Sequence, residues 1–151
     1  EMEIAGHHVA ALIALALYQS AAGSMRTIPE SALYYTYFRS HHSELATLVR
    51  DAEFFVSKEE LLDYHKTHTP DFSELQNKFG LVGKVNKWYR EVSSIIHGQI
   101  PGKWVEHTSL SEIKHIKSTL DIAVRTFCEG EELVHQLFLC KFETVSSPLF
   151  F

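Results

Sequence analysis

The sequence is poor in the residues that mark several classes of protein. Its 151 residues include only two Cys, four Pro and seven Gly, and no Asn-Gly or Asp-Gly pair occurs. This composition excludes collagen-like repeats and low-complexity disorder, and the missing turn pairs give no support to β-hairpins. No segment alternates apolar and polar residues over the length of a strand. We therefore expect an all-α globular protein.

An excess of positive charge is also missing. The chain has 14 Lys and Arg against 19 Asp and Glu, which gives a formal net charge of -5 with His neutral. This balance argues against a surface that holds nucleic acid by bulk electrostatics. An anionic ligand would need a local cationic site.

The sequence indicates neither a disulfide nor a membrane span. Cys128 and Cys140 fall in one expected helix, about 18 Å apart along its axis, whereas a disulfide joins alpha carbons within about 7 Å. The apolar run from Val9 to Leu17 is shorter than the roughly 20 residues that cross a bilayer, and acidic and His residues precede it where a signal peptide carries Lys or Arg. Unpaired cysteines favour a reducing compartment, so we predict a cytoplasmic protein without membrane contact.

Length and periodicity predict a single helical domain over residues 1-151, a bundle of about five helices with a long C-terminal helix. The first helix is expected from Ile4 to about Thr27 and, being apolar almost all round, should be deeply buried. Pro29 suits the first turn of a second helix that runs through Phe38. After a break at 41–43 the helix is expected to resume through Leu45, Leu48 and Val49.

Two capping boxes predict where later helices begin. Ser57 with Glu60 is expected to open a short helix, and Ser109 with Glu112 to open the long closing helix that reaches Phe142 despite Gly130. Between them we expect a short helix from Asp71 or Ser73 to Gly80, a helix from Lys84 to His97 that is stopped by Gly98, and a loop from Gln99 to Thr108.

The helix from Lys84 to His97 has two distinct faces at 100° per residue. A wide apolar face should be core; it contains Val85, Trp88, Tyr89, Val92, Ile95 and Ile96. On the opposite side Arg90, Ser93, Ser94 and His97 share a polar face, because positions i, i+3, i+4 and i+7 of a helix point the same way.

Arg90 and His97 supply the minimal chemistry for cleaving a phosphodiester without metal. A guanidinium offers permanently charged planar donors suited to a phosphate, and an imidazole exchanges a proton near neutral pH. Any amphipathic helix has a polar side, however, and spacing alone equally fits a solvated face. Both interpretations stay open on periodicity.

The stretch from Trp88 to Gly98, WYREVSSIIHG, resembles the signature of the HEPN superfamily, here as an Arg-x6-His motif from Arg90 to His97. The upstream segment from Ser20 to Glu44, which contains Arg26, Glu30, an aromatic run and His41-His42, is similar to the early helices of some HEPN proteins. The resemblance covers most of the chain in architecture and a short motif in sequence.

This resemblance implies a homodimer in which Arg90 and His97 of both protomers form a composite cleft. Many members of the superfamily are toxins or defence ribonucleases that cut RNA without metal or cofactor. Carried over, Arg90 would stabilise the scissile phosphate and His97 would transfer a proton, with Glu91, Ser93 and Ser94 in support. Expected partners are an RNA substrate and an antitoxin protein. The alternative is a catalytically inactive HEPN-like dimeric interaction or regulatory module.

Other sequence features give weaker indications. Lys103, Trp104 and His107 follow the motif in a loop with Pro and Gly, and we consider them possible substrate contacts. The chain has ten His, yet the pairs His7-His8 and His41-His42 lack the ligand spacing of a metal site. No Gly-rich phosphate loop, nucleophile elbow or dinucleotide fingerprint is present. We predict neither a metal nor a cofactor.

Overall fold

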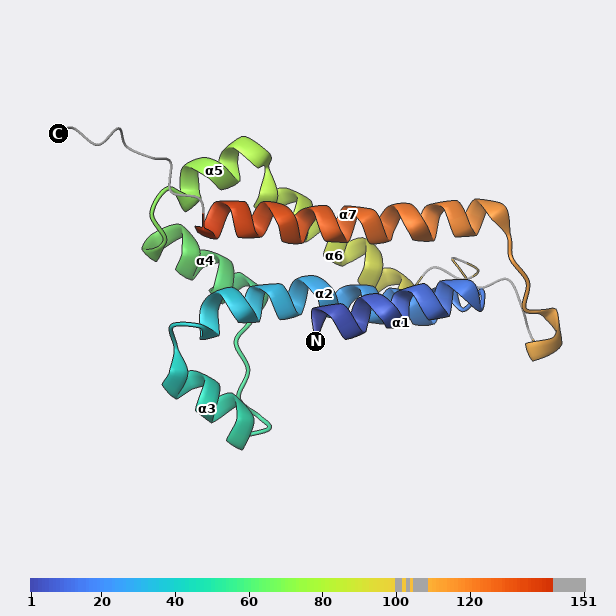
Figure 1. The fold of residues 1–151 in the computed structure, drawn as a ribbon, viewed down its shortest axis with the longest axis horizontal. Coiled ribbons are helices and arrows are strands. Elements are labelled where there is room, and N and C mark those ends of the chain that lie inside the picture. Colours follow the sequence, from blue (N-terminus) through green and yellow to red (C-terminus); the bar gives the residue numbers. More distant parts are fainter. Residues whose placement is uncertain (100–101, 103, 105–108, 143–151) are drawn as a thin grey trace.

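A computed structural model describes residues 1–99, 102, 104 and 109–142 (Figure 1). Within these residues the chain is helical and contains no strand, as expected. The elements in order are α1 (Met2–Ala14), α2 (Tyr18–Phe38), α3 (His42–Arg50), α4 (Lys58–His68), α5 (Phe72–Phe79), α6 (Leu81–Ile96), the 3-10 turn η1 (Leu110–Glu112) and α7 (Lys117–Phe142).

Helix α2 is the centre of the bundle. It packs against α1, α4, α6 and α7, and Figure 1 shows it running along the body of the molecule with α7 beside it. Its buried side includes Met25, Ala32 and Leu33. Helix α3 contributes no buried residue and projects from the body (Figure 1).

The expected first helix from Ile4 to about Thr27 is wrong, because the chain breaks after Ala14. Ala16 adopts a left-handed φ of 57°, and the Leu17 amide donates to the Leu12 carbonyl at 2.8 Å, which closes the end of α1. The new helix α2 then starts at Tyr18. The sequence gave no sign of this break, since residues 7–22 contain neither Gly nor Pro.

Two further expectations about these helices are corrected. Helix α1 buries only Ala5 and Val9, and Ile4 is 58% exposed, so α1 covers the bundle instead of forming its centre. Pro29 lies inside α2 and is buried. A proline removes one helical hydrogen bond, and packing of this side of α2 into the core compensates for that loss.

The two capping boxes differ in outcome. The box at Ser57 is confirmed, with the Glu60 amide donating to the Ser57 hydroxyl at 3.2 Å and the Ser57 amide donating to the Glu60 carboxylate at 2.8 Å. The box at Ser109 is wrong. Ser109 makes no capping bond, only the 3-10 turn follows it, and α7 begins at Lys117. The chain turns once more before the long helix begins.

Gly80 and Gly98 end helices as the sequence predicts. Their φ angles are 64° and 59°, in the left-handed region that favours glycine. The described residues form seven α-helices, more than the expected five or so, and α3 is one of them as a separate helix; the break between the first two helices falls at 15–17 and not before Pro29. Cys128 and Cys140 both lie on α7, and no disulfide joins them. No helix among the described residues has the length and apolar character that a membrane crossing needs.

Candidate functional site

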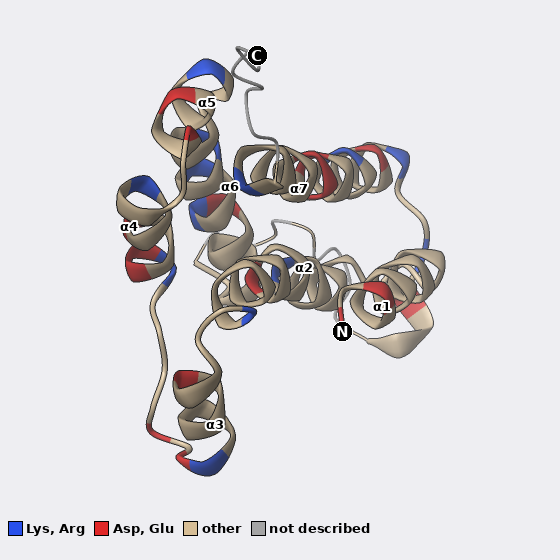
Figure 2. Cartoon of the chain, turned by 60° about the vertical axis from the view of Figure 1, so that its left-hand side comes forward, with Lys and Arg blue, Asp and Glu red and all other residues tan. Residues whose placement is uncertain are grey.

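Helix α6 lies between α2 and α7 and shows the two faces that its sequence predicts (Figure 1). The core side buries Leu81, Val85, Trp88, Tyr89, Val92 and Ile95. Of the charged residues on α6, Lys84, Lys87 and Arg90 are basic and exposed, and Glu91 is acidic. Figure 2 shows the blue Lys and Arg segments along this helix.

Arg90 and His97 are both exposed on the outer side of α6. They are two turns apart, about 10 Å along the axis. His97 is the C-terminal cap residue, and its amide donates to the Ser93 carbonyl at 3.0 Å. Helical spacing therefore puts both residues on the same side of α6, and their joint role as a site stays a prediction.

The two serines between Arg90 and His97 differ in their contacts. The Ser94 hydroxyl donates to the Glu91 carbonyl at 2.7 Å, so it is engaged with its own helix. The Ser93 hydroxyl accepts from a guanidinium nitrogen of Arg26 on α2 at 3.5 Å. Ser93 thus connects the Arg90 and His97 face to α2.

Glu91 lies on the side of α6 that faces α7. It is half-buried and lines a groove of about 690 Å³ between α6 and α7. Lys84, Lys87 and Arg125 line the same groove. Glu129 and Glu132 line it as well, so the groove carries cations and carboxylates in equal number at the side of the candidate site.

Helix α2 contributes side chains that the sequence did not assign to the site. The Gln19 amide donates to the Ile95 carbonyl in the last turn of α6 at 3.1 Å, and Arg26 reaches Ser93 further along. The two helices are therefore antiparallel at this contact. Gln19 and Arg26 are seven residues apart and share one side of α2, a polar spacing that a helical wheel of α2 could have revealed.

Arg26 is held in place by several contacts. Its Nε donates to Glu30 Oε1 at 2.7 Å, and its guanidinium lies 5.6 Å from the centre of the Tyr89 ring. Both charged side chains of this pair are more than a third exposed, so the pair itself adds little stability. Its geometric effect is to place a second guanidinium beside the outer side of α6.

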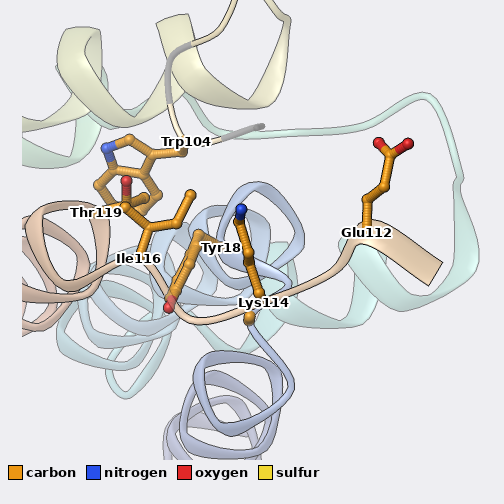
Figure 3. Close-up of a pocket in the computed structure, with 7 residues that line it drawn as sticks. Tyr18, Trp104, Glu112, Lys114, Ile116 and Thr119 are labelled. Atoms are coloured by element: carbon orange, nitrogen blue, oxygen red, sulfur yellow. The ribbon is translucent and has the colours of Figure 1, made fainter. Parts of the chain in front are cut away.

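The three possible substrate contacts have different positions. Lys103 and His107 lie outside the described residues. Trp104 is 5% exposed and packs near Tyr18, Ile116 and Thr119, as Figure 3 shows. This position gives the indole a packing role, and contact with a substrate stays a prediction.

The expected site has the chemistry of an anion subsite beside a proton-transfer group. Arg90 and Arg26 provide guanidinium donors, Ser93 a hydroxyl, and His97 an exposed imidazole. In the described part of the chain, no group of three or more His, Cys, Asp or Glu is placed to hold a metal ion. No family model matches this chain, and neither a curated protein nor a solved structure matches it.

Proposed function

We propose that the chain is a metal-independent endoribonuclease of the HEPN type that acts at a composite dimer cleft. The observation that carries this proposal is the placement of Arg90, Ser93 and His97 on one outer side of α6, with Arg26 of α2 reaching Ser93. This placement adds a second cation, Arg26 of α2, to the Arg-x6-His motif on which the resemblance depends.

The proposed reaction needs only groups of this kind and an RNA strand. A neutral His97 takes the proton of a ribose 2'-hydroxyl, and that oxygen attacks the adjacent phosphorus. The bond from phosphorus to the 5'-oxygen breaks, and the leaving oxygen takes up a proton from an imidazolium or from water. The products are a 2',3'-cyclic phosphate and a 5'-hydroxyl. Arg90 stabilises the additional negative charge on the phosphate oxygens in the transition state.

Partners and location follow from the same proposal. A homodimer would bring Arg90 and His97 of two chains to one cleft, and RNA would be the substrate. Activity of this kind harms its host unless it is restrained, so an antitoxin protein and a role as a toxin or in phage defence belong to the proposal. The location would be the cytoplasm, where RNA and reduced thiols occur together.

The test is RNA cleavage by the purified chain in the presence of a chelator. We expect a loss of about 100- to 10,000-fold in rate for His97→Ala and about 100- to 1,000-fold for Arg90→Ala. His8→Ala and Arg50→Ala are matched controls, because both residues are exposed on other helices. Equal cleavage by all four variants would remove the proposal. Light scattering should give twice the mass of one chain.

A second candidate is a catalytically inactive dimeric interaction or regulatory module. The exposed apolar residues of the projecting helix α3 favour it, since Val49 is 81% exposed and Leu45 is 38% exposed. Under this alternative the purified chain forms dimers and leaves RNA intact, and substitutions of Arg90 or His97 change neither result.

A further inference from the structure

A pocket of about 300 Å³ lies beside the candidate site, between α2, α4 and α6. Its wall includes Arg26, Glu30 and Tyr34 from α2, Lys58 from α4 and Tyr89 from α6, together with Phe55 from the connection before α4. Arg26 belongs to both places, because it also contacts Ser93 on the outer side of α6. A ligand in this pocket would therefore adjoin the face that carries Arg90 and His97.

Tyr89 lines this pocket, and its hydroxyl is buried without a hydrogen-bond partner. Tyr89 is 7% exposed. In the described part of the chain, its hydroxyl and the Trp104 indole nitrogen are the buried side-chain atoms in this state. A buried hydroxyl without a partner is unfavourable, and groups of this kind are rare in folded proteins. Burial also raises the pKa of Tyr89, so the phenol stays a neutral donor across the physiological range.

Two cations flank the Tyr89 ring, and each already has a carboxylate partner. Arg26 lies 5.6 Å and Lys58 Nζ 5.2 Å from the ring centre. Arg26 bonds Glu30 at 2.7 Å, and Lys58 bonds Glu59 at 2.8 Å. Two positive and two negative side chains give the pocket no net charge. This balance disfavours a free phosphate and favours a neutral ligand that has both donors and acceptors.

A nucleobase has this combination of properties. Its flat ring suits a wall with three aromatic side chains, Tyr34, Phe55 and Tyr89, and its edge carries donors and acceptors. Proteins that read single-stranded RNA stack unpaired bases on aromatic rings and guanidinium planes and bond their edges. Phe55 is 71% exposed, which leaves its ring available for such a contact.

We propose that this pocket binds a guanine base of the RNA strand, next to the phosphate held by Arg90. The inference rests on the proposed ribonuclease function and names its base preference. Guanine O6 and N7 are acceptors, which suit the donors of Tyr89 and Arg26. Guanine also presents adjacent N–H donors, and Glu30 keeps Oε2 for them because Arg26 bonds Oε1. Binding also requires a shift of side chains in the pocket, because the Tyr89 hydroxyl is buried.

The test is a calorimetric titration of the whole chain with each of the four nucleoside 5'-monophosphates. We expect the guanine nucleotide to bind about 10-fold or more tightly than the others. Tyr89→Phe should reduce this affinity about 10-fold, because the donor is lost and the ring is kept. Glu30→Gln should remove the preference for guanine over hypoxanthine, whose ring lacks the 2-amino group. Tyr18→Phe is the matched control, since its hydroxyl bonds His115 at 3.0 Å outside this pocket.

Three results would overturn the inference. The first is equal binding of all four nucleotides, and the second is an affinity for guanine that Tyr89→Phe leaves unchanged. The third is full displacement of the nucleotide by inorganic phosphate, which would mean that the pocket holds a phosphate and not a base.

Failure of the inference and failure of the proposed function give different results. The titrations are repeated with His97→Ala, which cannot transfer the proton and should bind guanine as the unchanged chain does. Guanine binding without any RNA cleavage would reject the nuclease and keep the base site. Cleavage that depends on His97 but shows no preference for guanine would keep the nuclease and reject the base site.

Discussion

Two adjacent buried aromatic residues on opposite flanks of α6 differ in their hydrogen bonding. On the α7 side, Trp88 donates from its indole nitrogen to the Thr126 carbonyl at 2.9 Å, and Gly130 leaves room for its ring. On the α2 and α4 side, Tyr89 has no partner for its hydroxyl. The residues are neighbours in sequence and similarly buried. We infer that the first flank is built for packing and the second keeps a donor for a ligand.

A buried histidine elsewhere in the core extends this comparison. His65 on α4 is fully buried, with Nδ1 2.9 Å from the Thr69 hydroxyl and Nε2 3.0 Å from the Thr36 hydroxyl. Both ring nitrogens are therefore satisfied by partners in the protein. Polar groups with complete partners should stabilise the fold, and an orphaned one should not. The predictions at His65, Tyr18 and Tyr89 below test that difference.

The largest effect is expected at His65. His65→Ala removes two buried hydrogen bonds and leaves a cavity between α2 and α4, which should cost about 4 kcal/mol in the free energy of unfolding. Urea denaturation measures this change. His68→Ala, an exposed residue on the same helix, should change the value by less than about 0.5 kcal/mol. A cost at His65 as small as that at His68 would contradict a structural role for the cluster.

The same histidine should make stability depend on pH. Burial lowers the pKa of His65 to about 4 from the ordinary 6.5, so the unfolded chain binds the proton more readily than the folded one. Its contribution is complete above pH 6.5 and is lost as the pH falls from 6.5 to 4, by about 3 kcal/mol in all.

The measurement is urea denaturation at several pH values between 7 and 4. His65→Gln keeps polar atoms at this position and cannot titrate, so its stability should fall less steeply over this range. Carboxylates contribute equally in both chains and cancel in the difference. Parallel curves for the two chains would show that His65 is not buried in its neutral form.

Gly130 tests the packed flank of α6. A Cβ at this position would lie 2.8 Å from a ring carbon of Trp88, so Gly130→Ala must push the indole away from its bond with Thr126. Gly23→Ala on α2 meets nothing within 4 Å and should gain from the better helix propensity of Ala. Thermal or urea unfolding should separate the two variants by about 2 kcal/mol. Equal stabilities would mean that this flank is loosely packed.

Much of this fold followed from local sequence signals. The Ser57 cap, the glycine stops at Gly80 and Gly98 and the two faces of α6 depend on a few neighbouring residues, and the structure confirms them. The break at Ala16 did not follow, because it depends on how α1 folds back onto α2. Pro29 was misplaced for a similar reason, since tertiary packing overrides its local preference for a helix start.

The candidate site was predictable only in part. The shared face of Arg90 and His97 follows from helical spacing within one element. The position of Arg26 beside α6 and the pocket at Tyr89 depend on how α2, α4 and α6 pack against one another. Residue spacing within one helix does not predict this packing. On the helical wheel Tyr89 belongs to the apolar core face, and only the structure shows that its hydroxyl lacks a partner.

The smallest expected effect on stability tests the flank of α6 that faces α2 and α4. Tyr89→Phe removes a hydroxyl that has no partner, so the folded chain should become more stable by about 1 kcal/mol or stay unchanged. Tyr18→Phe removes a hydroxyl that bonds His115 and should cost about 1 kcal/mol. The two substitutions delete the same atom type from similarly buried rings. Opposite signs in urea unfolding would show that the Tyr89 hydroxyl does not support the fold, whereas equal losses would mean that it has a partner in solution.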